Sequence, residues 1–442
     1  MPASLVFPAT RVFFMKIDII TLGCSKNTVD SEHLAADLMA QGHTVVFDQP
    51  GRDADCVVIN TCGFIGDAKE ESIETVLGAT AHRKKGQRIV VCGCLVERYR
   101  AELQKEIPEV DAWYGVHEWD RMAADLSLGD GKPVAVASRP LSTPGHYAYL
   151  KIAEGCNRSC SYCAIPLIRG AHRSRGMDEI VDEARRLVAH GVKELLVISQ
   201  DTTYYGLDLY RRRALGELLD RLANESGAEW IRLHYTYPSS FPDDAIEAIA
   251  RHDNICNYID IPLQHINSRL LASMQRGIDR EGTLRLLEKF RRRLPDVAVR
   301  TTLIVGYPGE TEADFEELKD FVAQARFDRM GCFAYSPEEG TQAYALGDPV
   351  PDEEKQRRVD ELMRVQEEVS LEKNRARVGR TFRCIVDRKE GDYWICRTEY
   401  DSPEVDDEVL VEERADLCVQ PGMFLPVCVT DALENDLMGR FV

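Results

Sequence analysis

Three cysteines near the middle of the chain have a spacing suited to holding one inorganic centre. Cys156, Cys160 and Cys163 lie in the segment EGCNRSCSYC, in a C-x3-C-x2-C pattern. A four-iron cluster takes four ligands, so three thiolates leave one iron open to a substrate or cofactor. Catalytic metal sites keep such an open position, whereas structural sites are normally closed. The alternatives are a structural zinc site or cysteines that are simply buried, although zinc motifs usually pair two C-x2-C elements.

A second set of three cysteines is spread over the N-terminal part of the chain. Cys24, Cys62 and Cys94 each follow a run that predicts a strand, namely KIDIITL, DCVVIN and RIVVCG. Because the carboxyl ends of parallel strands meet at one edge of a sheet, the three loops can converge there. Three unrelated small apolar residues at strand ends would explain the pattern equally well. Cys56 and Cys92 lie inside these runs and are predicted core residues.

The order of the predicted elements indicates an α/β protein of several domains. From Lys16 to about Val116, strands alternate with helices, which is typical of βαβ units around a parallel sheet. After a Gly- and Pro-rich connection from Leu126 to His146, six strand candidates separated by helices favour a partial, open TIM-type (βα)6 barrel. The segment from Asp352 to Arg377 predicts a long amphipathic helix. After Gly379, short strand-like runs predict a small all-β barrel or sandwich.

Composition limits the classes of protein and partner. The chain has 442 residues, which argues for two or three domains. Its 14 cysteines, without a recognisable export signal, point to metal binding or burial rather than disulfides. The net charge of -19 suits a basic partner protein, so direct binding of nucleic acid is not expected. No apolar run is long enough for a bilayer, and we expect a cytoplasmic protein that makes no use of a membrane.

The segment from Cys156 to Cys163, after a first barrel strand, resembles the radical S-adenosylmethionine superfamily. The resemblance implies that the open iron binds S-adenosylmethionine and cleaves it to a 5'-deoxyadenosyl radical. It also implies that Tyr162, directly before the third cysteine, lies against the adenine. The family uses a segment like VGYPGET, residues 305–311, beside the same pocket, which makes Gly306, Pro308 and Gly309 candidate cofactor contacts.

Further polar residues surround these segments in the sequence. Thr311 and Asp314 predict a capping box that opens the next helix. The second barrel strand ends in a polar cluster that we expect to contact the cofactor, namely Ser199, Gln200 and Asp201. Three arginines after the radical motif would either bind a carboxylate of the cofactor or substrate, or form a solvated basic surface; they are Arg169, Arg173 and Arg175.

The segments TLGCSKNTVDSE, INTCGFIGDAKEES and CGCLVERY resemble the N-terminal domain of methylthiotransferases. In that family three such cysteines hold an auxiliary iron-sulfur cluster, a role that falls here on Cys24, Cys62 and Cys94. The resemblance covers nearly the whole chain, and the acidic C-terminal domain resembles the TRAM domain. It implies two 4Fe-4S clusters, S-adenosylmethionine as both methyl donor and radical source, and a reductant such as flavodoxin or ferredoxin.

This resemblance divides the chain into four parts. Residues 1–14 would be a flexible extension and residues 15–133 the methylthiotransferase domain with the auxiliary cluster. Residues 134–376 would form the radical domain, and residues 377–442 a TRAM-like barrel that binds the substrate. The fold class is therefore a multidomain α/β protein with a C-terminal all-β barrel.

Members of the family act either on adenosine in transfer RNA or on an aspartate of small-subunit ribosomal protein S twelve (uS12). Lys26 in TLGCSKNTVDSE and His265, which follows Gln264 in IPLQHINSRLLASMQRG, resemble the ribosomal-protein branch. The transfer RNA branch tends to carry Gln-Met-Asn and Gln-Ser-Gly there. His265 itself is assigned no catalytic role, because a buried, hydrogen-bonded histidine is an equally good explanation.

The charge of the last predicted domain favours the same branch. Residues 377–442 hold 8 Lys and Arg against 15 Asp and Glu, a net charge of 8 - 15 = -7. An acidic domain suits a basic ribosomal protein better than a polyanion. We therefore expect a methylthio group to be added to the β-carbon of an aspartate in ribosomal protein S twelve, free or in the small ribosomal subunit. The alternatives are a transfer RNA methylthiotransferase and a non-catalytic, ribosome-associated metal-binding factor.

Overall fold

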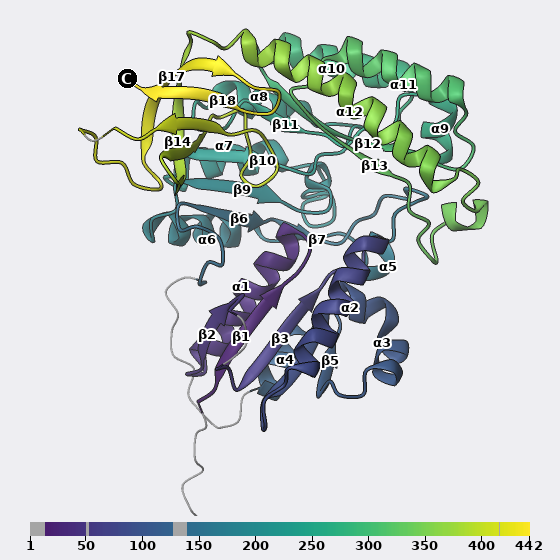
Figure 1. Ribbon diagram of the computed structural model, residues 1–442, viewed down its shortest axis with the longest axis vertical. Coiled ribbons are helices and arrows are strands. Elements are labelled where there is room, and N and C mark those ends of the chain that lie inside the picture. The colour runs from purple at the N-terminus through teal and green to yellow at the C-terminus, as the bar shows by residue number, and fades with distance from the viewer. Residues whose placement is uncertain (1–13, 50–52, 127–138, 415) are drawn as a thin grey trace, which may run out of the picture. The chain divides into compact units, whose positions relative to one another are not determined.

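The computed structural model describes residues 14–49, 53–126, 139–414 and 416–442 (Figure 1). The chain divides into two compact units, Met1–Ser142 and Thr143–Val442. The predicted extension, apart from its last residue, and the predicted boundary between residues 133 and 134 lie outside the described residues. Among the residues that are described, no helix has the length and apolar character needed to cross a membrane.

The first unit contains a parallel sheet of five strands in the order β2-β1-β3-β4-β5. The strands are β1 (Lys16–Thr21), β2 (Thr44–Phe47), β3 (Cys56–Thr61), β4 (Arg88–Gly93) and β5 (Ala112–Tyr114). Since both faces of a parallel sheet are covered, β3 and β4 are apolar along most of their length and almost wholly buried. Cys56 and Cys92 are fully buried in these strands, which confirms their predicted place in the core.

Helices cover both faces of this sheet. Residues of α1 (Ser25–Ala40) and α4 (Trp119–Leu126) pack on one face, and residues of α2 (Gly66–Ala81) and α3 (Cys94–Glu106) pack on the other. Alternate residues of a strand point to opposite faces, so β1, β3, β4 and β5 contribute to both cores, whereas Val45 and Phe47 of β2 pack on the side of α1. The predicted parallel α/β arrangement is confirmed.

The second unit begins with six parallel strands that form an open, partial barrel (Figure 1). They lie in two hydrogen-bonded groups, β10-β9-β6 and β11-β12-β13. The groups meet where Ile231 pairs in parallel with Ile255 and the amide of Thr236 donates to the carbonyl of Asp260 over 3.1 Å. Their bounds are β6 (Tyr147–Lys151), β9 (Glu194–Ile198), β10 (Trp230–Leu233), β11 (Tyr258–Asp260), β12 (Ala298–Val305) and β13 (Arg329–Ala334).

Helices connect these strands, as the sequence predicted. They are α6 (Met177–Ala189), α7 (Leu215–Glu225), α8 (Asp243–Arg251), α9 (Ser268–Ser273), α10 (Arg280–Arg293) and α11 (Glu312–Ala325). A short antiparallel pair, β7 (Ala153–Glu154) and β8 (Arg173–Ser174), encloses the cysteine loop and the helix α5 (Ile165–Arg169). Single turns of 3-10 helix stand at η1 (Thr202–Tyr204) and η2 (Ala343–Leu346).

A long helix and a small closed barrel complete the second unit. The helix α12 (Asp352–Arg375) has acidic residues in its first turn and basic residues in its last turn, which complements the helix dipole. The strands of the closed barrel run in the order β14-β15-β16-β18-β17. They are β14 (Thr381–Glu390), β15 (Tyr393–Arg397), β16 (Val409–Glu412), β17 (Phe424–Ala432) and β18 (Leu437–Phe441). The last strand, LMGRF, lacks β-branched residues and was not among the predicted strands.

Buried ion pairs connect this closed barrel to the (βα)6 barrel. Glu194 of β9 accepts from Arg397 of β15 over 2.8 Å and from Arg232 of β10 over 2.7 Å. Burial alone would raise the pKa of Glu194, but the two guanidinium groups hold it below its ordinary value. The three side chains are almost fully buried, so each charge depends on its partners.

Candidate active site

The first cysteine set lies on one irregular loop between β7 and α5, at the carboxyl end of the first barrel strand. The amide of Cys156 donates to the carbonyl of Gly170, and the amide of Cys163 donates to the carbonyl of Cys160, each over 3.1 Å. Gly155 has a φ of +78°, and a Cβ there would overlap the carbonyl oxygen of Ala171. The loop therefore brings the three cysteines together through its own backbone, with a position that only glycine fits.

The environment of these thiols is suited to a bound metal centre. Burial raises the pKa of Cys156 to about 11 and that of Cys163 to about 12. Thiols in such surroundings stay protonated until a metal ion provides positive charge. The sulfur of Cys160 accepts from Nη1 of Arg276 over 3.3 Å, and the sulfur of Cys156 accepts from the amide of Arg158 over 3.4 Å. Hydrogen-bonded sulfurs are typical of iron-sulfur sites.

Tyr162 lies among apolar side chains at the same end of the barrel. It packs against a cluster that includes Leu270, Met274 and Tyr335. Its hydroxyl oxygen accepts from Nη1 of Arg276 over 3.2 Å. The guanidinium of Arg276 thus holds the hydroxyl and apolar side chains hold the ring, while the predicted contact of Tyr162 with adenine stays a prediction.

The polar residues after β9 contain unsatisfied hydrogen-bonding atoms. Oγ of Ser199 and Oε1 of Gln200 are buried and have no hydrogen-bond partner among the described residues. Nε2 of Gln200 donates to Oε1 of Glu154 over 2.6 Å, and Asp201 accepts from Nε of Arg158 over 2.6 Å. Buried polar atoms without partners are costly, so these two oxygens fit a site that a polar ligand completes.

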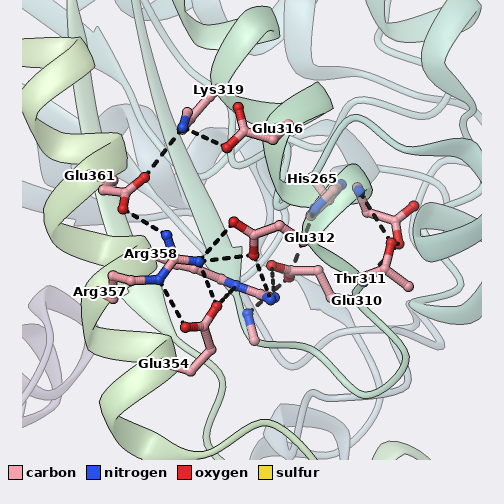
Figure 2. Close-up of polar contacts among 12 residues, drawn as sticks. His265, Glu310, Thr311, Glu312, Glu316, Lys319, Glu354, Arg357, Arg358 and Glu361 are labelled. Carbon is pink, nitrogen blue, oxygen red and sulfur yellow. Dashed lines mark hydrogen bonds and ion pairs between the residues drawn. The ribbon is translucent and has the colours of Figure 1, made fainter.

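The segment VGYPGET begins at the last residue of β12 and is held in place by side chains of α12 (Figure 2). Gly306 has a φ of +75°, and its amide donates to Oε2 of Glu310 over 2.9 Å. Oε1 of the same carboxyl group accepts from Nη1 of Arg358 over 2.7 Å. The predicted capping box of Thr311 and Asp314 is confirmed, with both of its hydrogen bonds present. Gly309, also at positive φ, is exposed, whereas Pro308 is buried.

His265 is fully buried behind this segment (Figure 2). Its Nδ1 accepts from the amide of Asn267 over 2.9 Å, and its Nε2 lies 3.8 Å from Oε2 of Glu310. Burial lowers the pKa of His265 to about 3, so the imidazole is neutral near pH 7. These contacts match the interpretation of His265 as a buried, hydrogen-bonded histidine.

The three arginines after the radical motif do not form one cluster. Arg169 is buried, and its Nη1 donates to Oε2 of Glu154 over 3.2 Å. Arg175 pairs with Glu179 over 2.6 Å and with Glu183 over 2.7 Å. Arg173 is exposed on β8 and Arg175 is half-buried, so the alternative of a solvated basic surface is wrong for Arg169.

Two residues beside Cys160 were not predicted from the sequence, namely Tyr237 and Arg276. Their positions in the chain lie far from the cysteine loop, and no local spacing connects them to it. The segment IPLQHINSRLLASMQRG contains two arginines, Arg269 and Arg276, and its local pattern does not show which of them reaches Cys160.

The second cysteine set lies at the carboxyl edge of the parallel sheet in the first unit. Cys24 is the N-cap of α1, Cys62 follows β3 directly, and Cys94 is the first residue of α3. Because β1, β3 and β4 are neighbours, these three positions lie side by side along the edge. A Cβ on Gly23 would lie 2.7 Å from the Cβ of Cys62, which shows how closely the first two loops approach.

A single asparagine connects the three loops. The amide of Asn27 donates to the carbonyl of Cys24 over 2.8 Å, and its Nδ2 donates to the carbonyl of Thr61 over 3.2 Å. The thiol of Cys94 donates to Oδ1 of Asn27 over 3.8 Å. The convergence expected from the parallel-strand rule is therefore present in the structure.

Neither of the two cysteine sets is arranged around a single metal ion. Within the described ranges, no group of three or more His, Cys, Asp or Glu residues is placed to bind one metal ion. All six cysteines lie outside disulfides and so offer thiols, the ligand type that iron-sulfur clusters take, and each cysteine of a cluster binds its own iron. The donor chemistry therefore fits two clusters, and the assignment of the ligands is a proposal.

Comparisons with protein families match three parts of the chain. A model of the radical SAM superfamily matches residues 150–322, and a TRAM domain model matches residues 378–442. A model described as uncharacterized protein family UPF0004 matches residues 16–115.

Solved structures share the fold. Radical S-adenosylmethionine methyltransferase TsrM from Kitasatospora setae has a TM-score of 0.53 and 15% identity, over 74% of this chain and 77% of that chain. The cobalamin-dependent radical enzyme OxsB has a TM-score of 0.51 and 10% identity, over 79% of this chain and 56% of that chain. At these identities the likeness is one of fold alone.

Curated relatives match over nearly the full length. "Ribosomal protein uS12 methylthiotransferase RimO" of Parabacteroides distasonis is 54% identical over 428 residues, 96% of this chain and 98% of that protein. The protein of the same name from Flavobacterium psychrophilum is 53% identical over 427 residues, again 96% and 98%. The chain therefore belongs to the ribosomal protein uS12 methylthiotransferases, a family of radical S-adenosylmethionine enzymes.

Proposed function

We propose that this enzyme adds a methylthio group to the β-carbon of an aspartate in ribosomal protein uS12. The observation that carries the proposal is the loop of Cys156, Cys160 and Cys163 at the carboxyl end of the first barrel strand, where barrels of this type place their chemistry. High identity over nearly the full length of relatives named for uS12 supports the choice of substrate.

Two sets of cysteines would hold the two 4Fe-4S clusters of the reaction. Cys156, Cys160 and Cys163 would bind the radical cluster and leave one iron open, and Cys24, Cys62 and Cys94 would bind the auxiliary cluster. When bound, the clusters and S-adenosylmethionine supply the electron, the hydrogen-abstracting radical and the methylthio group. The electron would come from a reductant such as flavodoxin or ferredoxin.

The protein's own side chains would bind and orient the cofactor. At the carboxyl end of β9, Oγ of Ser199 can donate or accept a hydrogen bond, and Oε1 of Gln200 can accept one. Tyr162 offers an aromatic surface, and Gly306, Pro308 and Gly309 bring backbone close to the ligand without bulky side chains. Such fixed groups hold reacting atoms in place, which contributes to catalysis by proximity.

The closed C-terminal barrel would bind the ribosomal protein. Its net charge of -7 attracts a basic partner and repels a phosphate backbone. In this proposal residues 15–133, 134–376 and 377–442 act as the auxiliary-cluster domain, the radical domain and the substrate-binding domain. The family models at residues 16–115, 150–322 and 378–442 support the order of these parts.

The substrate is tested by offering both acceptors to the reconstituted enzyme. Reduced enzyme with S-adenosylmethionine is incubated with uS12 and, separately, with transfer RNA, and both products are weighed by mass spectrometry. We expect a methylthio group on one aspartate of uS12 and unchanged transfer RNA. Modification of the RNA alone would overturn the proposal, and failure to form 5'-deoxyadenosine would favour a non-catalytic factor.

The ligand assignment is tested by iron and sulfide analysis. Alanine variants of each complete cysteine set are compared with the wild type by electron paramagnetic resonance. We expect each triple variant to lose one cluster and keep the other. A variant of either set that keeps both clusters would contradict the assignment for that set.

A further inference from the structure

Arg276 is a buried cation in direct contact with a proposed cluster ligand. It follows α9, and only 3% of its surface is exposed. Its Nη1 donates to Sγ of Cys160 over 3.3 Å and to the hydroxyl oxygen of Tyr162 over 3.2 Å, and its Nη2 donates to the carbonyl of Pro262. Its guanidinium carbon lies 4.3 Å from the ring centre of Tyr237. The side chain is therefore fixed at the sulfur by contacts on several sides.

The positive charge of Arg276 is not offset by a carboxylate. Among the described residues, its polar contacts are a sulfur, a hydroxyl and a carbonyl oxygen, and its buried Nε has no partner. A buried cation is unfavourable unless an anion compensates it. The one contact that becomes anionic when iron binds is the sulfur of Cys160.

Arg158 provides a contrast at the same site. It also stacks on Tyr237, with its guanidinium carbon 3.9 Å from the ring centre. Its Nε, however, donates to Asp201 over 2.6 Å, so its charge is offset within the protein. Of the two guanidinium groups on this ring, Arg276 is the one that donates a hydrogen bond to the sulfur of Cys160.

Tyr237 positions Arg276, and Arg276 remains the hydrogen-bond donor to the sulfur of Cys160. Its hydroxyl lies 3.5 Å from Sγ of Cys160 and also donates to the backbone carbonyl of Arg276 over 2.9 Å. A hydroxyl has a single proton, and here the shorter bond takes it. The ring and hydroxyl of Tyr237 thus hold both the backbone and the guanidinium of Arg276.

We propose that Arg276 is the counter-cation of the radical cluster and raises its reduction potential through Cys160, with Tyr237 as a positioning residue. The proposal rests on the proposed role of Cys156, Cys160 and Cys163 as cluster ligands. One-electron reduction by the external reductant adds negative charge to the cluster. A nearby positive charge and a hydrogen bond to a ligating sulfur both stabilise that reduced state.

The test is a redox titration of the radical cluster, followed by electron paramagnetic resonance without S-adenosylmethionine. It uses the full-length enzyme with Cys24, Cys62 and Cys94 changed to alanine, so that one cluster titrates. Arg276→Gln removes the charge. We expect the equilibrium constant for one-electron reduction to fall at least tenfold, which is 59 mV toward lower potential.

Two comparisons separate this effect from a general change of charge. Arg285→Gln removes the same charge from an exposed position on α10 and is expected to leave the potential unchanged. Tyr237→Leu removes the ring on which Arg276 stacks and is expected to lower the potential, whereas Tyr237→Phe keeps the ring and is expected to shift it much less. If Arg276→Gln takes up no iron, the potentials of Tyr237→Leu and Tyr237→Phe test the proposal instead.

The outcomes also separate this inference from the proposed function. A loaded Arg276→Gln cluster with the wild-type potential overturns the role of Arg276, even though the cluster is present. Equal potentials in Tyr237→Leu and the wild type overturn the positioning role of Tyr237. If the alanine variant of Cys156, Cys160 and Cys163 keeps its full iron content, the proposed function itself fails.

Discussion

Arg358 of α12 donates from Nη1 to Oε1 of Glu310 over 2.7 Å, and both side chains are buried (Figure 2). The other oxygen of this carboxyl group accepts from the amide of Gly306 over 2.9 Å. The long helix that leads to the closed barrel is thereby tied to the loop after β12, beside the proposed cofactor site. The shape of this loop depends on an ion pair formed across two distant segments.

Arg358→Gln should loosen that loop. Removing one partner of a buried ion pair typically costs about 3–5 kcal/mol. Burial raises the pKa of Glu310 to about 7 even beside Arg358, so in the variant the carboxyl takes up a proton and we expect a loss below that range. We expect a lower free energy of unfolding by urea and a raised KM for S-adenosylmethionine. Arg357→Gln is the matched control, since Arg357 directly precedes Arg358 in α12 and its ion pairs with Glu312 and Glu361 lie partly open to solvent. Equal losses in the two variants would contradict the role of Arg358.

His265 should make the stability of the enzyme sensitive to mild acid. Its pKa is lowered by burial to about 3 in the folded protein, against 6.5 as its ordinary value. The unfolded chain therefore binds a proton below pH 6.5 that the folded chain does not, and stability falls as the pH falls. The loss amounts to about 1.4 kcal/mol per pH unit, or roughly 2 kcal/mol at pH 5.

The measurement is urea unfolding at pH 7.5 and pH 5 for the wild type and His265→Asn. The asparagine keeps an acceptor for the amide of Asn267 but does not titrate. We expect the variant to lose less stability than the wild type on acidification. Identical losses would show that His265 does not titrate in the way its burial implies.

Gly155→Ala should disturb the radical cluster selectively. A Cβ at this position meets the backbone carbonyl of Ala171, which cannot move aside, and the positive φ adds a cost of about 1–2 kcal/mol. We expect reduced iron uptake at the first cysteine set and loss of 5'-deoxyadenosine formation. Gly176→Ala is the control, because the nearest atom to its added Cβ would be 4.0 Å away. A Gly155→Ala enzyme with full iron content would count against the need for glycine.

Asn27→Ala should impair the auxiliary cluster and leave the radical cluster active. Asn27 connects the loops of Cys24, Cys62 and Cys94, so its loss should weaken the auxiliary cluster alone. We expect about half of the wild-type iron, continued 5'-deoxyadenosine formation and no methylthio transfer to uS12. Thr28→Ala, one position further along α1, should keep both clusters. Full methylthio transfer by Asn27→Ala would contradict the proposed connection.

Much of the site could be predicted from the sequence, because the relevant patterns are local. The C-x3-C-x2-C spacing of Cys156, Cys160 and Cys163 keeps the ligands within one loop. The capping box of Thr311 and Asp314 depends on a separation of three residues. The placement of Cys24, Cys62 and Cys94 at one edge of the sheet was predicted from a general rule, because neighbouring parallel strands end at the same edge. In these cases short-range geometry carries the information.

Periodicity and spacing act over short stretches of chain, and they were enough to predict the alternation of strands and helices, the two cysteine sets and the family. Only the tertiary structure brought Arg276 to Cys160 across 116 positions, and Arg358 to Glu310 across 48. It also buried Arg169 against Glu154 and paired the half-buried Arg175 with Glu179. The packing of whole helices and strands decides which buried cation pairs with which anion. No local sequence pattern predicts these pairs.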